Sequence, residues 1–141
     1  MKPGIQTFLA EAGEAACYAL AIIKLSRRIE GEFGDPVEDL VAGINHGFIH
    51  YNWADPDDND NFFVTNPEEF LGFLTGRAWT VRKESPDYLA KPGELIVQRW
   101  ERQITGQTIS HFRLPDWDSF VNSKTVKFGK VASLRVFAPA A

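Results

Sequence analysis

Residues 16–29 read ACYALAIIKLSRRI, and their apolar side chains recur with the period of an α-helix. Four of them follow one another at steps of four, three and four residues: Tyr18, Ile22, Leu25 and Ile29. Side chains at these steps share one face of a helix, and the cations of the last turns suit its dipole. The pattern predicts an amphipathic helix over about 14–30, with Cys17 near its start.

Cap and proline signals predict two further helices after this one. Asp35-Pro36 resembles a cap followed by proline at the first helical position, and it predicts a short helix that stops by Gly47. Asn66-Pro67 repeats the signal and predicts a helix over about 67–75, which Gly76 closes. For residues 4–12 we expect either a helix or a loop.

Strand patterns follow the helices. Segment 62–64 is strand-like, and strands are expected at 78–82, 94–102 and 108–114, with a turn at Thr105-Gly106-Gln107. Segments 125–128 and 131–137 flank Gly129-Lys130, which predicts a hairpin. Helices first and strands last favour the α+β class over alternating α/β. We expect one domain over 1–141, with N-terminal helices packed on a C-terminal antiparallel β-sheet.

Composition narrows the class of protein. The chain has 141 residues, 44% hydrophobic and 24% charged, which is typical of a globular domain. Its net charge of −4 disfavours a general nucleic-acid partner. A single cysteine rules out an intramolecular disulfide, and no apolar run is long enough to span a membrane. With no clear signal peptide, we expect a cytoplasmic protein; oligomeric state cannot be predicted.

Cys17 is the first candidate for chemistry. Backbone N–H groups and the helix dipole favour a thiolate at a helix start, although Glu11 and Glu14 oppose this if they lie close. The alternative is a small, buried packing residue, which is the usual role of a free cysteine.

His111 is the second candidate, because a nucleophilic cysteine needs a base and the base needs an orienting group. It lies centrally in the strand 108–114, on the face opposite Phe112 and Leu114. Asp116 and Asp118 follow at the strand end and could orient the imidazole, with Asn122 as a weaker candidate. The alternative is a half-exposed strand histidine beside solvated loop acids.

The order of these residues resembles the papain-like cysteine peptidase fold. The similarity is closer to the small bacterial branch that includes bacteriocin-leader peptidases, and closest to a bacterial and phage-borne family of that branch. It spans roughly 5–137 and rests on short motifs: Ala16-Cys17-Tyr18-Ala19-Leu20, Ser110-His111-Phe112, Trp117-Asp118-Ser119, the segment 122–127, Gly129-Lys130-Val131 and Arg135-Val136-Phe137.

The resemblance implies a site and an activity. Cys17 would be the nucleophile, His111 the general base, and Asp118, or else Asp116, the orienting acid. The family also has a glutamine ahead of the cysteine that helps to bind the oxyanion. Gln6 lies eleven residues before Cys17 and Glu11 six before it, and an ionised glutamate cannot donate a hydrogen bond.

The segment 45–61 suggests a substrate-binding rim. It carries His50, Trp53 and several aspartates, and loops of this length are often functional. We expect it to border the cleft beside Cys17, with Trp117 as a further aromatic lining residue, and to favour cationic ligands.

Metal motifs in this region are incomplete, so we expect no metal and no cofactor. His46 and His50 are four residues apart, which on one helix would place both on the same face for zinc. Gly47 between them is expected to end the helix, and no glutamate completes a zinc motif. The acidic run lacks the glycine and glutamate of a calcium loop.

Two functions therefore compete. The first is a thiol hydrolase acting on a peptide or a peptidoglycan-like substrate through an acyl-enzyme. The second is a binding or interaction protein that keeps the papain-like fold without catalysis, which the distant Gln6 favours. A metal-dependent protein using His46, His50 and the acidic run is a third alternative.

Overall fold

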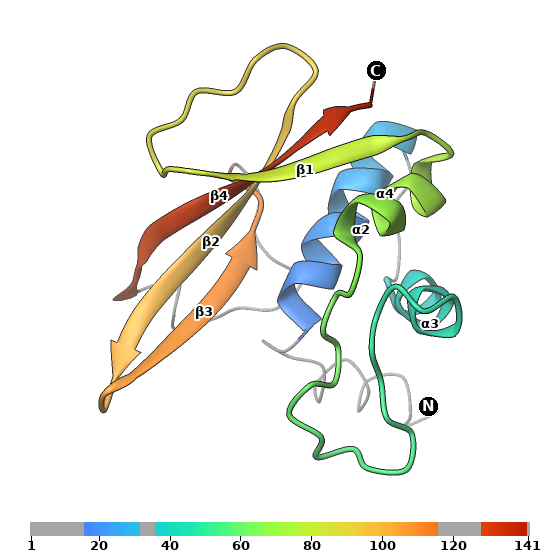
Figure 1. Cartoon of the computed structure of the whole chain (residues 1–141), viewed down its shortest axis with the longest axis vertical. Coiled ribbons are helices and arrows are strands. Elements are labelled where there is room, and N and C mark those ends of the chain that lie inside the picture. The colour runs from blue at the N-terminus through green and yellow to red at the C-terminus, as the bar shows by residue number, and fades with distance from the viewer. Residues whose placement is uncertain (1–15, 32–35, 116–127, 141) are drawn as a thin grey trace.

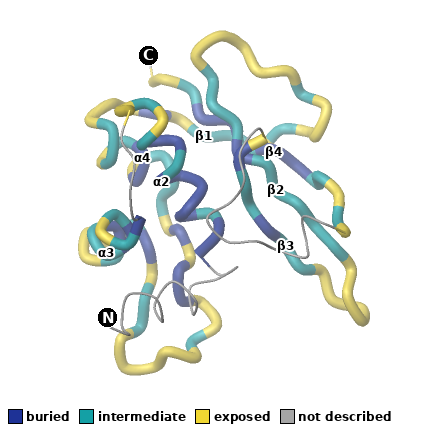
Figure 2. The backbone as a smooth tube through the Cα atoms, turned by 180° about the vertical axis from the view of Figure 1, so that it is seen from behind, coloured by how far each residue is buried: buried dark blue, intermediate teal, exposed yellow. Residues whose placement is uncertain are grey.

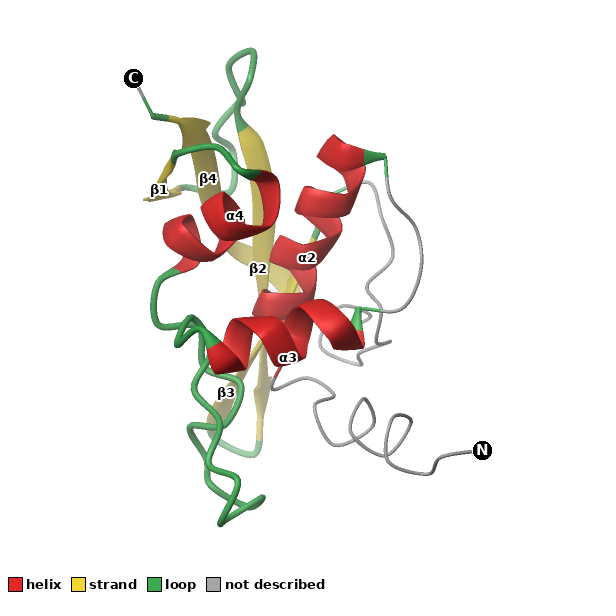
Figure 3. Ribbon diagram, turned by 90° about the vertical axis from the view of Figure 1, so that its right-hand side faces the viewer, coloured by secondary structure: helices red, strands yellow, loops and turns green. Residues whose placement is uncertain are grey.

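The computed structural model describes residues 16–31, 36–115 and 128–140. Helices come first: α2 (Cys17–Glu30), α3 (Val37–Asn45) and α4 (Pro67–Thr75). Strands follow: β1 (Trp79–Glu84), β2 (Leu95–Ile104), β3 (Gln107–Arg113) and β4 (Lys130–Pro139). The helices lie on one side of the sheet (Figure 1 and Figure 3). The expected α+β class is confirmed.

The sheet is antiparallel throughout, and its strand order differs from the chain order. The order is β1-β4-β2-β3, so β4 lies between β1 and β2, and β3 forms an edge. Thr105 and Gly106 both have positive φ angles, 50° and 78°, which suits the tight turn between β2 and β3. Lys130, expected in a turn, is the first residue of β4. Phe128, expected at the end of the preceding strand, is not in a strand, and residues 125–127 lie outside the described residues.

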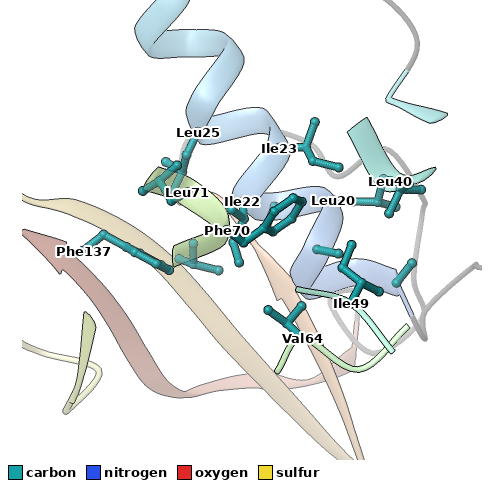
Figure 4. Packing of buried hydrophobic residues seen from close by; sticks show 14 of the residues in the cluster. Leu20, Ile22, Ile23, Leu25, Leu40, Ile49, Val64, Phe70, Leu71 and Phe137 are labelled. Atoms are coloured by element: carbon teal, nitrogen blue, oxygen red, sulfur yellow. The ribbon is translucent and has the colours of Figure 1, made fainter. Parts of the chain in front are cut away.

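α2 is buried on more than the single face that its periodicity predicts. Most of its first ten residues are buried, and only the last turn is exposed (Figure 2). α4, β3 and α3 all pack against it. Figure 4 shows Leu20, Ile22 and Leu25 of α2 among core side chains from α3, α4 and β4. The described helix starts at Cys17, and Gly31 closes it with a φ of 70°.

The helix over 67–75 has the predicted boundaries. The Asn66 side chain accepts a hydrogen bond from the backbone N–H of Glu69 at 3.4 Å, Pro67 is the first helical residue, and Gly76 caps the end in the left-handed conformation. Gly43 of α3 faces this helix closely, because a Cβ there would lie 2.9 Å from the ring of Phe70. The strand expected at 62–64 reduces to one bridge between Ile49 and Val64.

A polar cluster ties the loop between β1 and β2 to β1. The carboxylate of Glu94 accepts hydrogen bonds from the Tyr88 hydroxyl at 2.6 Å, the Lys91 backbone N–H at 2.8 Å and Arg82 Nη2 at 2.7 Å. These donors, Tyr88 first, lower the pKa of Glu94 to about 2.

Among the described helices, none has the length and apolarity needed to cross a membrane.

A substitution at Leu40 tests whether α3 packs into the core as described. Its side chain is 0% exposed, so Leu40→Ala leaves a cavity and should lower the free energy of unfolding by about 2–5 kcal/mol. Leu89→Ala is the matched control, since Leu89 is 86% exposed and its loss should cost less than about 0.5 kcal/mol. Urea denaturation measures both. Equal losses would contradict the described packing of α3.

A substitution at Glu94 tests whether its carboxylate cluster makes the stability of the fold depend on acid pH. Its pKa is depressed on folding, so the stabilisation is fully present above about 4.5 and is lost as the pH falls toward about 2. Glu94→Gln should therefore be less stable at pH 7 and should lose less stability over that acid range. Glu84→Gln leaves all three donors to Glu94 in place and should keep the acid-dependent loss. Thermal unfolding from pH 2 to 7 measures this. Parallel curves for parent and Glu94→Gln would refute the role of the cluster.

Candidate functional site

The start of α2 meets the free edge of the sheet at Cys17. β3 is an edge strand, and alternate N–H groups of such a strand point away from the sheet. The sulfur of Cys17 accepts a hydrogen bond from the backbone N–H of Phe112, with 3.3 Å between sulfur and nitrogen. Two residues 95 positions apart in the chain are thus joined at the junction of helix and sheet (Figure 1).

This hydrogen bond also places Cys17 next to His111. Bonds of about 1.3 and 1.5 Å link the Phe112 nitrogen, through the carbonyl carbon of His111, to the His111 Cα. The sulfur therefore lies no more than about 6 Å from that Cα, given the 3.3 Å contact. The fold therefore brings the Cys17 sulfur near the backbone of His111. That the imidazole of His111 reaches the sulfur stays a prediction.

Burial at this junction is nearly complete. Cys17 is 5% exposed and His111 is 0% exposed. The interpretation of His111 as a half-exposed histidine is wrong, because its edge-strand position does not leave it open to solvent. Its cross-strand partner is Trp100 of β2, and directly opposed residues share a face of the sheet. Phe112 is paired with the neighbouring residue of β2, Arg99, so it lies on the other face, as the alternation along the strand predicts.

The backbone around Cys17 favours negative charge at the sulfur. Cys17 is the first residue of α2, where the positive end of the helix dipole lies. The first turn of α2 holds no acidic residue, and Ala16 at the N-cap offers no side-chain acceptor to the first N–H groups. The desolvation that comes with burial opposes this effect, since a charged sulfur loses its water.

An aromatic and cationic stack flanks the sulfur, and sequence reasoning did not identify it as part of the site. The rings of Tyr18 and Phe112 stack with their centroids 4.3 Å apart. The guanidinium of Arg135 lies 5.7 Å from the centroid of the Phe112 ring. Burial raises the pKa of Tyr18 well above its usual value. Adjacency to Cys17 and His111 in the chain could have indicated Tyr18 and Phe112. Arg135 belongs to one of the motifs that carry the resemblance, but the sequence assigned it no role at the site.

Several residues expected at the site lie outside the described residues. They are the proposed orienting acids Asp116 and Asp118, the aromatic Trp117, the oxyanion candidate Gln6, and the weaker candidates Glu11, Glu14 and Asn122. Their roles stay predictions.

The expected substrate-binding segment 45–61 is attached beside α2. Ile49 inside the segment and Val64 shortly after it belong to the same buried cluster as Leu20 (Figure 4). Its proposed contact residues are exposed: Trp53 is 64% exposed, and His50 is 3.4 Å from the carboxylate of Asp58. That the segment borders a cleft at Cys17 stays a prediction.

A surface pocket of about 320 Å³ opens on this segment. His50, Asp60, Phe63 and Thr65 line it. The pKa of Asp58 is lowered, chiefly by the backbone N–H of Asp60 and also by His50 and Asn52.

His46, by contrast, packs its ring against Phe73 with 4.5 Å between centroids. Across 16–31, 36–115 and 128–140, no three potential metal ligands gather.

Comparison with known proteins adds no assignment, because no family model, no curated protein and no solved structure matches the chain. The interpretation of the site therefore depends on the chemistry of its own residues.

Cys17 can be tested as an acceptor at the edge of β3. Cys17→Ala removes the acceptor of the Phe112 N–H and should lower the free energy of unfolding by about 1–2 kcal/mol. Cys17→Ser keeps an acceptor and should cost less. Hydrogen exchange of the Phe112 amide should accelerate only in Cys17→Ala. Equal destabilisation and equal exchange in the two variants would mean that the sulfur only fills space.

Proposed function

We propose that this protein is a papain-like thiol hydrolase that cleaves a peptide or amide bond through an acyl-enzyme. The supporting observation is the 3.3 Å contact between the Cys17 sulfur and the Phe112 nitrogen, next to His111. It ties a helix-start cysteine to the residue that follows the strand histidine, and the proposal that the His111 ring reaches the sulfur comes from the sequence resemblance. A nucleophile and its base must lie within hydrogen-bond reach for this chemistry, with looser contacts in a site without substrate.

The proposed reaction has two steps. His111 takes the proton of the Cys17 thiol, and the sulfur attacks the carbonyl carbon, forming a C–S bond. The C–N bond then breaks, and His111 gives its proton to the leaving amine. In the second step His111 takes a proton from water, whose oxygen attacks the thioester, and the C–S bond breaks. The acid product leaves and the thiol is restored.

Two further roles complete the proposal. Asp118, or else Asp116, would accept a hydrogen bond from the His111 ring and hold its tautomer. The backbone N–H of Cys17, at the start of α2, would donate to the oxyanion, with Gln6 as the candidate second donor. The substrate class is a peptide, including peptidoglycan cross-links, leader peptides and isopeptides.

The second candidate function is a non-catalytic binding protein that retains the fold. The burial of both Cys17 and His111 favours it, since a substrate carbonyl reaches the sulfur only if the covering side chains move. The two candidates differ in the reactivity of the thiol.

Alkylation of Cys17 by iodoacetamide separates them. A free cysteine with a pKa of about 8.5 is almost entirely protonated at pH 6. The proposed enzyme should react about tenfold or more faster than free cysteine at that pH, because His111 supports the thiolate. His111→Gln should remove the excess, and His46→Gln should not, since His46 lies against Phe73 and outside the site.

The orienting acid is tested in the same assay. Asp118→Asn should slow alkylation more than Asp116→Asn if Asp118 holds the imidazole. A thiol that reacts only after denaturation, or a rate that His111→Gln leaves unchanged, would favour the binding protein and reject the hydrolase.

A further inference from the structure

Arg135 is a half-buried cation whose contacts are all with neutral groups. It lies on β4, and its Nη1 donates to the hydroxyl of Ser133 at 2.9 Å and to the backbone carbonyl of Leu134 at 3.4 Å. Its guanidinium also lies over the ring of Phe112. Within the part of the chain that the structure describes, no carboxylate pairs with Arg135.

A second arginine shares this face of the sheet. Arg99 of β2 lies directly between Ser133 and Phe112 in the strand register, and Ser133 and Arg135 alternate onto the same face. The guanidinium of Arg99 donates to the Glu101 carboxylate at 3.0 Å and to the Ser110 hydroxyl at 2.6 Å. Glu101 therefore compensates the charge of Arg99. Burial, and then the charge of Arg99, lower the pKa of Arg135. Lys83 of β1 lies directly opposite Arg135 in the register and is exposed. Among the described residues, this face therefore keeps two positive charges without a carboxylate partner, half-buried Arg135 and exposed Lys83.

Phe112 links the charge of Arg135 to the sulfur of Cys17. Phe112 contacts the guanidinium of Arg135 through its ring and the sulfur of Cys17 through its backbone N–H. One residue thus separates the cation from the thiol. Tyr18, the residue after Cys17, stacks its ring on that of Phe112, and the charge of Arg135 lowers the pKa of Tyr18 against the larger, opposite effect of burial.

An arginine in this setting is suited to binding an anion. Its planar fork matches a carboxylate or phosphate with two parallel hydrogen bonds. A partly buried charge held only by neutral acceptors is costly, and an anion from outside would relieve that cost. Ser133 and Arg99 stand beside it as further donors, and the intermediate exposure of Arg135 leaves a route for a ligand.

We propose that Arg135, assisted by Arg99, binds a carboxylate of the substrate beside Cys17, so that the preferred substrate is an acidic peptide. The carboxylate would sit within a few residues of the bond that Cys17 attacks. The assignment of the ligand as a substrate rests on the proposed hydrolase function, whereas the anion site itself does not.

Thermal unfolding at constant ionic strength tests the anion site directly. The probes are N-acetylglycine, which carries a carboxylate, its neutral amide N-acetylglycinamide, and inorganic phosphate. N-acetylglycine should raise the Tm and the amide should not, because a ligand that binds only the folded state stabilises it. Arg135→Gln should weaken the apparent affinity at least tenfold, and Arg135→Lys should recover part of it.

Arg113→Gln is the matched control. Arg113 also contacts only neutral groups, the Leu114 carbonyl and the ring of Trp100, but it lies on the opposite face of the sheet. It should keep the response to N-acetylglycine. An equal loss in both variants, or no rise of Tm with any probe, would overturn the site. A response to phosphate alone would overturn the peptide carboxylate.

A second measurement relates the site to the thiol. Iodoacetate carries a carboxylate and iodoacetamide does not, so the ratio of their alkylation rates at Cys17 reports an anion site beside the sulfur. The ratio should fall several-fold in Arg135→Gln and stay unchanged in Arg113→Gln. A Tm rise with a thiol that does not react in the native state would reject the hydrolase and keep the anion site. An Arg135-independent ratio at a reactive thiol would reject a carboxylate subsite near the sulfur.

Discussion

The burial of α2 is the constraint on which the rest of the structure depends. The helix presents apolar side chains on nearly every side of its first ten residues, and it is stable in water only when other elements cover them. α3, α4 and β3 all pack against it. A helix covered in this way cannot shift along its axis without opening the core, so its first residue is held at the edge of β3.

That position serves the sheet and the site together. An edge strand carries backbone N–H groups with no strand partner, and one of them, at Phe112, uses the sulfur of Cys17. Three features therefore lie at this junction. They are the positive end of the α2 dipole, the buried residue His111 and the stacked rings of Tyr18 and Phe112. The arrangement stabilises the junction whatever its chemistry, which is why packing and catalysis compete as explanations of Cys17.

Local signals predicted the helices and most strands well, because their causes lie within a few residues. The boundaries of α4 follow from Asn66, Pro67 and Gly76, and the turn at Thr105 and Gly106 joins the expected strands. The position of β4 between β1 and β2 was not predictable, since strand order depends on distant pairing. Arg135 was missed for the same reason. Arg135 lies near Phe112 and Arg99 only because β4 pairs with β2, so its place at the site could not be read from its own stretch of sequence.

The central place of β4 has a consequence for how the chain folds. β1 pairs with β4 alone among the described strands, and β4 also pairs with β2 from Leu95 to Glu101. During synthesis, the helices and the β2–β3 hairpin emerge from the ribosome before the strand that unites them. β1 therefore stays without a partner until about fifty further residues have been made. Loop closure of that length slows assembly and leaves a nascent strand edge open to other chains, so folding of the sheet is completed late in synthesis.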